Sequence, residues 1–175
     1  MSLDWAVGQI ITDERLNRRL PIRRSKPGNT AAAGDASVNA DPDLVFTLKA
    51  NTTYDLRGVL LVTSAADNTG DFRRAWIWTG GTATVTMGGA GGVNTILTGS
   101  SGDGEWVAKD PDSTSPTAEI TYVASTTVTG SLVDDEVVVG TADITLTLTW
   151  AQATASGTTT LRAGSRVVAY PTDGT

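Results

Sequence analysis

Residues Ile144 to Trp150 carry the feature that most constrains the fold, a strict alternation of large apolar side chains with threonine. A repeat of two residues sends alternate side chains to opposite faces of a pleated strand, and β-branched threonine suits the face that meets water. This segment is therefore expected to be a strand with one core face. Thr158–Leu161 and Ser165–Tyr170 are expected to be extended as well, separated by an Ala163–Gly164 turn. The chain is thus predicted to end in a pair or triplet of antiparallel strands.

Short apolar or alternating segments separated by turn residues recur through the middle of the chain. Asn51–Thr52 is expected to turn the chain between two long strands, Gly88–Gly92 to form a turn rather than a phosphate-binding loop, and Asp134–Glu136 to form a hairpin tip. With no helical pattern after residue 26, about ten short strands predict one all-β domain, a sandwich or a barrel. The further strands expected are Leu44–Ala50, Tyr54–Leu61, Phe72–Trp78, Thr82–Met87, Val93–Leu97, Glu105–Ala108, Ala118–Ala124, Thr126–Val133 and Val137–Val139.

Residues 1–26 differ in composition from the rest of the chain. Thr12 is placed to cap a short helix with acidic residues in its first turn and arginines in its last, and Pro21 would end that helix near Leu20. Such a helix is too short to be stable alone, so it is expected to pack on its own domain or on a neighbouring molecule. Residues 25–42 are rich in small and turn-forming residues and are expected to be a linker, with a boundary near Ser37. The expected division is an N-terminal arm and linker over residues 1–36 and a β-sandwich domain over residues 37–175.

Charge is unevenly distributed along the chain. The formal charge is −6, and residues 1–26 hold six basic and three acidic side chains, so that segment is +3 and the remainder −9. Clustered arginines suit contact with an acidic protein surface, a solvated helix end, or an arm that binds nucleic acid. Docking on a protein is favoured, because the acidic body would repel a nucleic acid and no aromatic residue is interleaved with the arginines. No apolar run approaches the roughly 20 residues of a membrane span, so no membrane contact is expected.

The residue types that common catalytic sites need are missing. The chain has no cysteine and no histidine, which excludes Ser-His-Asp triads, Cys-His pairs and HExxH zinc sites. Adjacent acids such as those of residues 134–136 point to opposite faces of a strand and cannot flank a substrate bond. A Ca²⁺ site is an alternative use of four acidic residues, Asp103, Glu105, Asp110 and Asp112. Their spacing lacks the EF-hand pattern, so a solvated loop is favoured. No enzyme activity, cofactor or metal is therefore expected.

Four tryptophans fall within or beside the expected strands: Trp76, Trp78, Trp106 and Trp150. Tryptophan in so small a domain is usually buried, so these are expected to be core or inter-subunit aromatics. A sugar-stacking platform is the alternative use of such a side chain.

Three stretches resemble a recurrent domain of tailed-phage virion proteins. They are ADPDLVFTLKANTTYDLRGVLL (Ala40–Leu61), DFRRAWIW (Asp71–Trp78) and LTLTWAQATASGTTTLRAGSRVV (Leu146–Val168), and the opening DWAVGQIITDERLNRRL (Asp4–Leu20) is similar to the N-terminal tether of such proteins. The shared pattern is an acidic residue and an apolar strand, Ala-Asn-Thr-Thr-Tyr, a second apolar strand, and an aspartate-headed strand with tryptophan. It closes on a Trp-Ala-Gln strand and an Arg-Ala-Gly-Ser turn. Thr79–Gly81 departs from the family, which has a Pro-Ala-Gly turn there.

The resemblance implies an all-β fold, a jelly-roll β-sandwich of the tumour-necrosis-factor-like kind with about ten antiparallel strands, preceded by an extended N-terminal arm with one short helix. It also implies a homotrimer attached to the virion by that arm. The expected function is a capsid decoration or accessory subunit on the outer surface of a tailed bacteriophage, bound to the major capsid protein or to tail proteins. The alternative is a minor tail protein at the tail tip that binds host-surface glycan. The expected virion contacts in the arm are Trp5, Ile10, Ile11, Arg15, Leu16, Arg18 and Arg19.

Overall fold

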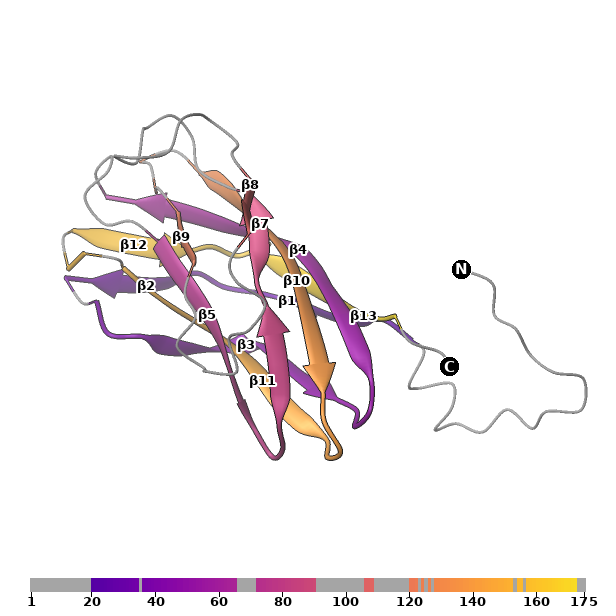
Figure 1. Ribbon diagram of the computed structural model, residues 1–175. Coiled ribbons are helices and arrows are strands. Elements are labelled where there is room, and N and C mark those ends of the chain that lie inside the picture. Colours follow the sequence, from indigo (N-terminus) through magenta and orange to yellow (C-terminus); the bar gives the residue numbers. More distant parts are fainter. Residues whose placement is uncertain are drawn as a thin grey trace, which may run out of the picture.

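The fold is all-β and is built from two main antiparallel sheets (Figure 1). The structure is a computed structural model that describes residues 20–34, 36–65, 72–90, 106–108, 120–122, 124, 126, 128–152, 154–155 and 157–172. Within these ranges the chain forms strands, turns and bends and no helix. The expected all-β class with antiparallel strands is confirmed, whereas the short helix expected after Thr12 falls almost wholly outside the described residues.

The described strands are β1 (Ile22–Ser25), β2 (Thr30–Ala33), β3 (Asn39–Leu48), β4 (Thr53–Ser64), β5 (Phe72–Thr79), β6 (Ala83–Thr86), β7 (Gly88–Ala90), β8 (Trp106–Ala108), β9 (Ile120–Tyr122), β10 (Thr129–Val139), β11 (Ile144–Gln152), β12 (Thr158–Leu161) and β13 (Arg166–Pro171). The larger sheet has the order β1, β13, β4, β10, β6, and β12 pairs with both β4 and β2. The smaller sheet has the order β3, β11, β5, β9, while β7 and β8 form a separate ribbon.

The hydrophobic core lies between the two sheets because apolar side chains alternate along their strands. In β11 the side chains of Ile144, Leu146, Leu148 and Trp150 are buried, as their spacing predicts. Thr145 faces water, but Thr149 is buried and its Oγ1 donates a hydrogen bond to the carbonyl oxygen of Ala75 at 3.2 Å. A buried threonine is satisfied by such a bond, so it can lie between apolar neighbours.

Aromatic side chains from three strands of the smaller sheet, β3, β5 and β11, meet in this core. Phe46 of β3 contacts Trp76 of β5 edge to face, with ring centroids 6.0 Å apart, and Phe72 lies 5.9 Å from Trp150. Trp76 and Trp150 are thus core residues, as expected, and Trp78 is partly buried against the same cluster. The side chain of Trp106 lies outside the described part of the chain.

The hairpin tip expected at Asp134–Glu136 is wrong, because β10 runs unbroken from Thr129 to Val139. Asp134 and Glu136 face outward, while Asp135 is buried and forms an ion pair with Arg74 at 2.6 Å. That pairing offsets the cost of burying a carboxylate, so three acidic residues can occupy the middle of a strand. The expected turn at Gly88–Gly92 is also wrong for its first three residues, which form β7.

Two strands lie in the segment expected to be an arm and linker. β1 pairs with β13 and β2 pairs with β12, so residues 22–33 extend along the edge of the larger sheet. These strands read IRRS and TAAA and most of their side chains are exposed. They lack the alternation that identifies a strand in sequence, and their pairing comes from backbone hydrogen bonds instead.

The connections also differ from the simplest expectation. Asn51, at a φ of 53°, turns the chain as predicted, but β3 and β4 on either side of it belong to different sheets. At the C-terminal end β12 and β13 both pair with β4, one after the other, while β11 lies in the other sheet. The predicted pairing of the closing strands with one another is therefore wrong, although the predicted turn at Ala163–Gly164 is confirmed by a φ of 87° at the glycine.

Candidate functional site

Arg74 and Asp135 form an ion pair inside the sandwich that joins its two sheets. Arg74 extends from β5, with Nη1 2.6 Å from Asp135 Oδ2 and Nη2 3.0 Å from Oδ1. Trp76 Nε1 donates to Oδ2 at 2.6 Å, and the backbone N–H of Gly88 donates to Oδ1 at 2.9 Å. Both charged side chains are fully buried. Because each carboxylate oxygen accepts two hydrogen bonds, we interpret Asp135 as a structural residue that holds β10 to β5 rather than as an acid or base that a substrate could reach.

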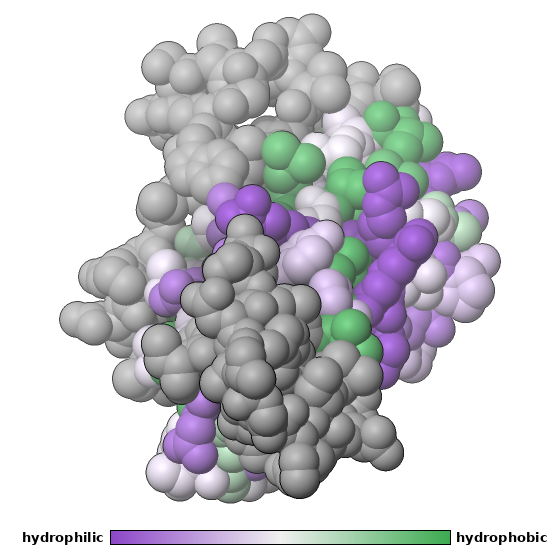
Figure 2. All heavy atoms as spheres, turned by 90° about the vertical axis from the view of Figure 1, so that its right-hand side faces the viewer, coloured by the Kyte–Doolittle hydropathy of each residue, from purple (hydrophilic) through white to green (hydrophobic). Residues whose placement is uncertain are grey.

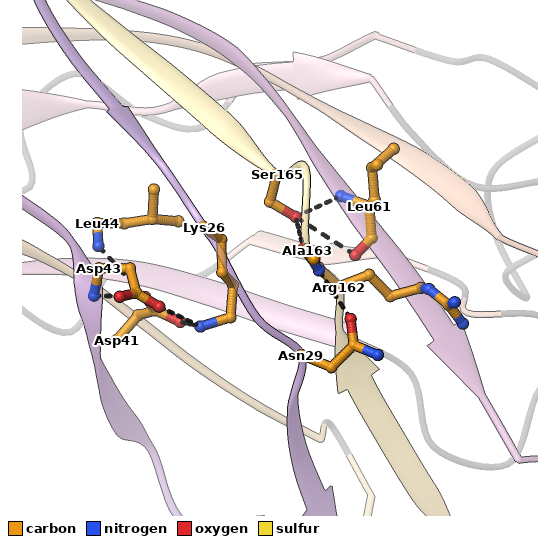
Figure 3. A network of polar contacts seen from close by, with 9 residues as sticks. All are labelled: Lys26, Asn29, Asp41, Asp43, Leu44, Leu61, Arg162, Ala163 and Ser165. Carbon is orange, nitrogen blue, oxygen red and sulfur yellow. Dashed lines mark hydrogen bonds and ion pairs between the residues drawn. The ribbon is translucent and has the colours of Figure 1, made fainter.

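A second buried cluster fixes the edge segment that carries β1 and β2 (Figure 3). Lys26 places its Nζ 2.7 Å from Asp41 Oδ2 and 3.0 Å from Asp43 Oδ2. Burial acting alone would lower the pKa of Lys26, but the hydrogen bonds and negative charges of Asp41 and Asp43 outweigh it, and the pKa is raised above its ordinary value. Lys26 therefore stays charged and clasps the edge segment to the start of β3.

Asp41 is itself held in place by the backbone. Its Oδ1 accepts hydrogen bonds from the backbone N–H groups of Asp43 at 3.0 Å and Leu44 at 3.2 Å. This is the local turn geometry that short acidic side chains favour. The carboxylate is thereby oriented toward Lys26 before β3 continues into the core.

Residues 162–165 form a kink where β12 passes into β13 along the edge of β4. The backbone N–H of Arg162 donates to the Leu61 carbonyl at 2.8 Å, and the Leu61 N–H donates to Ser165 Oγ at 2.9 Å. The serine hydroxyl thus replaces the backbone acceptor that a regular ladder would supply. The Ala163 N–H donates to Asn29 Oδ1 at 2.8 Å (Figure 3). This hydrogen bond joins the kink between β12 and β13 to the connection between β1 and β2.

Sequence reasoning missed both buried ion pairs, although a signal was present. Arg74 is two residues from Phe72 and two from Trp76, so the period of a strand places it with the inward-facing set. Asp135 has the same relation to Val133 and Val137. A charged residue inside an inward-facing set predicts a buried partner of opposite charge. Arg74 and Asp135 are such partners for one another.

The outer face of the larger sheet carries a group of apolar side chains, here called the outer patch, of which two are exposed and three are half-buried: Val128 and Leu132, and Val59, Leu61 and Val168. Leu132 is 47% exposed and Val128 46%. The register places Val59 between Leu132 on β10 and Arg166 on β13. Figure 2, which looks onto the right-hand side of Figure 1, shows hydrophobic residues gathered in patches beside a band of hydrophilic ones. Exposed apolar side chains gathered on one face are typical of a protein contact.

Charged residues on this face are arranged by sign. Arg23 and Arg166 lie on the β1 and β13 side, and Asp134 and Glu136 lie on the β10 side. Between them Arg57 is 3.5 Å from Asp55 and 3.6 Å from Asp134. The face is thus basic on β1 and β13 and acidic on β10, and the strand between them, β4, carries both apolar side chains and the Arg57–Asp55 pair.

The arm residues expected to contact the virion, Trp5, Ile10, Ile11, Arg15, Leu16, Arg18 and Arg19, lie outside the described residues, as do the acidic residues weighed as calcium ligands. Among the residues that the structure describes, no three acidic side chains are grouped so as to hold a metal ion. No helix in this part of the chain is long and apolar enough to cross a membrane.

Comparison with known proteins finds no match to a family model, to a curated protein or to a solved structure.

Proposed function

We propose that this protein is a structural virion protein of a tailed bacteriophage, a homotrimeric capsid decoration or accessory subunit on the outer surface of the particle. Its N-terminal arm, through Trp5, Ile10, Ile11, Arg15, Leu16, Arg18 and Arg19, would contact the major capsid protein or tail proteins. The proposal starts from the resemblance in sequence and is supported by three features of the fold.

The first supporting feature is that the residues carrying the resemblance are the ones that hold the sandwich together. Asp41 at the head of the first stretch clasps Lys26, Arg74 in the second pairs with Asp135, and Ser165 in the third forms the kink. Residues with such specific partners are costly to replace. The likeness therefore concerns the determinants of a fold, and the function follows from it only by analogy.

The second feature is the order in which the chain visits the two sheets. From β3 to β11 the strands of the two main sheets alternate between them: β3, β5, β9 and β11 lie in the smaller sheet, and β4, β6 and β10 in the larger. The last two strands, β12 and β13, both lie in the larger sheet. Repeated crossing between facing sheets is how a jelly roll is wound, and this order supports that description of the fold.

The third feature is the outer patch with its flanking charges, which supports self-association and carries the proposal furthest. In a ring of identical subunits, one side of a subunit meets the opposite side of the next. The basic side, with Arg23 and Arg166, would meet the acidic side, with Asp134 and Glu136, while the patch between them is covered. A ring of three such contacts accounts for the exposed leucine and valines.

The arm is attached next to this surface. β1 begins at Ile22, opposite Ala169 near the end of β13, and Leu20 before it is 49% exposed. The described chain therefore begins at the end of the larger sheet where β13 ends. In a ring all copies of the arm would leave from the same end, which suits attachment of the whole ring to one particle surface.

A deletion tests the attachment. Particles grown with a chain that lacks residues 1–19 should carry none of it after purification, while the truncated chain should keep the urea midpoint of the full chain, because β1 and its partners are intact. The triple variant Arg15→Ala, Arg18→Ala, Arg19→Ala should show reduced occupancy. Particles that retain the truncated chain in full would refute attachment by the arm.

A further inference from the structure

An open groove of about 370 Å³ lies at the corner of the sandwich where the ends of β5 and β10 meet β6. It is lined by Trp78, Gly81, Thr82, Ala83, Thr84, Val138 and Gly140. Its volume falls within the usual range of small-ligand sites, about 300–1,000 Å³. The groove is separate from the outer patch and from both buried ion pairs.

The lining residues combine one flat apolar wall with hydroxyl groups. Trp78 is partly buried and packs against the hydrophobic core, so the ring is fixed at the wall of the groove. The hydroxyls of Thr82 and Thr84 make no hydrogen bond to any residue that the structure describes, and the Thr82 carbonyl accepts from the Gly140 N–H at 2.8 Å. The Gly140 N–H is thus paired within the protein, and the threonine hydroxyls are left to face a ligand.

The chemistry of this lining selects the class of ligand. None of the lining residues is charged, so a charged ligand would lose its hydration without gaining a partner. A peptide added as a strand needs pairing along several residues, and only Ala83 and Thr84 of β6 line the groove. A ligand ring with one apolar face and a rim of hydroxyls, such as a sugar ring, can stack on a tryptophan and exchange hydrogen bonds with neighbouring threonines.

We infer that this groove binds a neutral saccharide, one pyranose ring stacking on Trp78 while its hydroxyls exchange hydrogen bonds with Thr82 and Thr84. The site is independent of the trimer and of the virion attachment proposed above, so its failure would leave both untouched. An open groove with two hydroxyls implies weak binding, of the order of 1 mM for a single ring.

The test is a titration of the ¹⁵N-labelled full chain by two-dimensional NMR with four neutral sugars: methyl β-D-glucopyranoside, maltose, cellobiose and N,N′-diacetylchitobiose. At least one should shift the Trp78 indole N–H and the amides of Thr84 and Gly140 saturably. Glucuronic acid, which presents a similar ring with a carboxylate, should bind at least roughly tenfold more weakly because its charge has no partner. The absence of a shift with all four sugars would overturn the inference.

Variants assign the binding to the groove. Trp78→Ala should abolish the shifts, and Thr84→Val, which keeps the volume and removes the hydroxyl, should weaken binding several-fold. Ile77→Thr changes the exposed neighbour on the opposite face of β5 and should leave binding unchanged.

Urea midpoints check that each variant folds, and Trp78→Phe replaces Trp78→Ala if Trp78→Ala does not fold. Shifts that survive both Trp78→Phe and Thr84→Val, or a peptide of residues 1–19 that shifts the same signals when the sugars do not, would contradict saccharide binding here.

Discussion

At the scale of single residues, the sandwich depends on a few charged side chains that lie where apolar ones are expected. Arg74 and Asp135 face each other across the core. Lys26 is buried directly after β1, where it pairs with Asp41 of β3. A buried charge is costly unless it is paired and hydrogen bonded. These residues therefore specify which strands may face one another.

Asp135→Asn is expected to lower the free energy of unfolding by about 3–5 kcal/mol, because it leaves the Arg74 guanidinium buried without a counter-charge. Urea denaturation followed by tryptophan fluorescence measures the loss. Arg57→Gln is the matched control, since it removes ion pairs of the same sheet that are largely exposed and should cost no more than about 1 kcal/mol. Equal losses in the two variants would contradict a special role for the buried pair.

Lys26 gives the protein an alkaline limit to its stability. Its folded pKa is raised above the ordinary lysine value of 10.5, so its contribution to stability is fully present below that pH and is lost as the pH rises through the folded pKa. Urea midpoints of the natural chain should therefore fall more steeply above pH 10.5 than those of Lys26→Met, which has no group to titrate at this position. Parallel curves for the two proteins on the alkaline side would refute this.

At the scale of elements, strands were predictable from sequence where one face alone is buried. β11 was predicted almost to the residue because large apolar residues and threonines alternate along it. β10 was read as two pieces because its central acids resemble a turn, and only the position of Arg74 explains why the strand continues. β1 and β2 gave no signal, since each packs only one apolar side chain against the core, Ile22 or Ala32, and is otherwise held by neighbouring strands and by Lys26.

The approach of β13 to β4 depends on a glycine. A Cβ at Gly58 would collide with the backbone carbonyl oxygen of Arg166 and lie 2.8 Å from the Val167 Cα. Because these are backbone atoms of a paired strand, Gly58→Ala should lower the unfolding free energy by about 1–3 kcal/mol. Gly130→Ala on the neighbouring strand meets only a Val59 methyl at 3.3 Å and is expected to cost less. A urea midpoint for Gly58→Ala equal to that of Gly130→Ala would contradict this packing.

At the scale of the whole molecule, the pairing of strands was beyond the reach of the sequence pattern. Alternation shows which face of a strand is buried, but it does not show which strand lies beside it. The tight Asn51 turn resembles a hairpin, yet it carries the chain from one sheet to the other because Leu44, Phe46 and Leu48 of β3 and Leu56 and Leu60 of β4 are buried from opposite sides of the same core. The arm residues proposed as virion contacts remain a prediction.

Assembly is predicted to depend on the outer patch. Leu132→Asp should convert the proposed trimer into a monomer at micromolar concentration without lowering the unfolding midpoint of the subunit, because Leu132 is exposed in the single chain. Light scattering coupled to size exclusion measures the mass. Ile77→Asp, a similar change at an exposed position on the smaller sheet, should leave the proposed trimer intact. A Leu132→Asp protein with the mass of the natural one would remove the patch from the interface.

The proposed location on the particle is tested most directly by immunogold labelling of intact phage with an antibody against residues 37–175. Gold spread over the head, and absent from particles whose chain lacks residues 1–19, is the predicted result. Gold confined to the tail tip would contradict a capsid decoration protein and favour a minor tail protein that binds host glycan. Purified particles that bind no gold at all would contradict a virion role altogether.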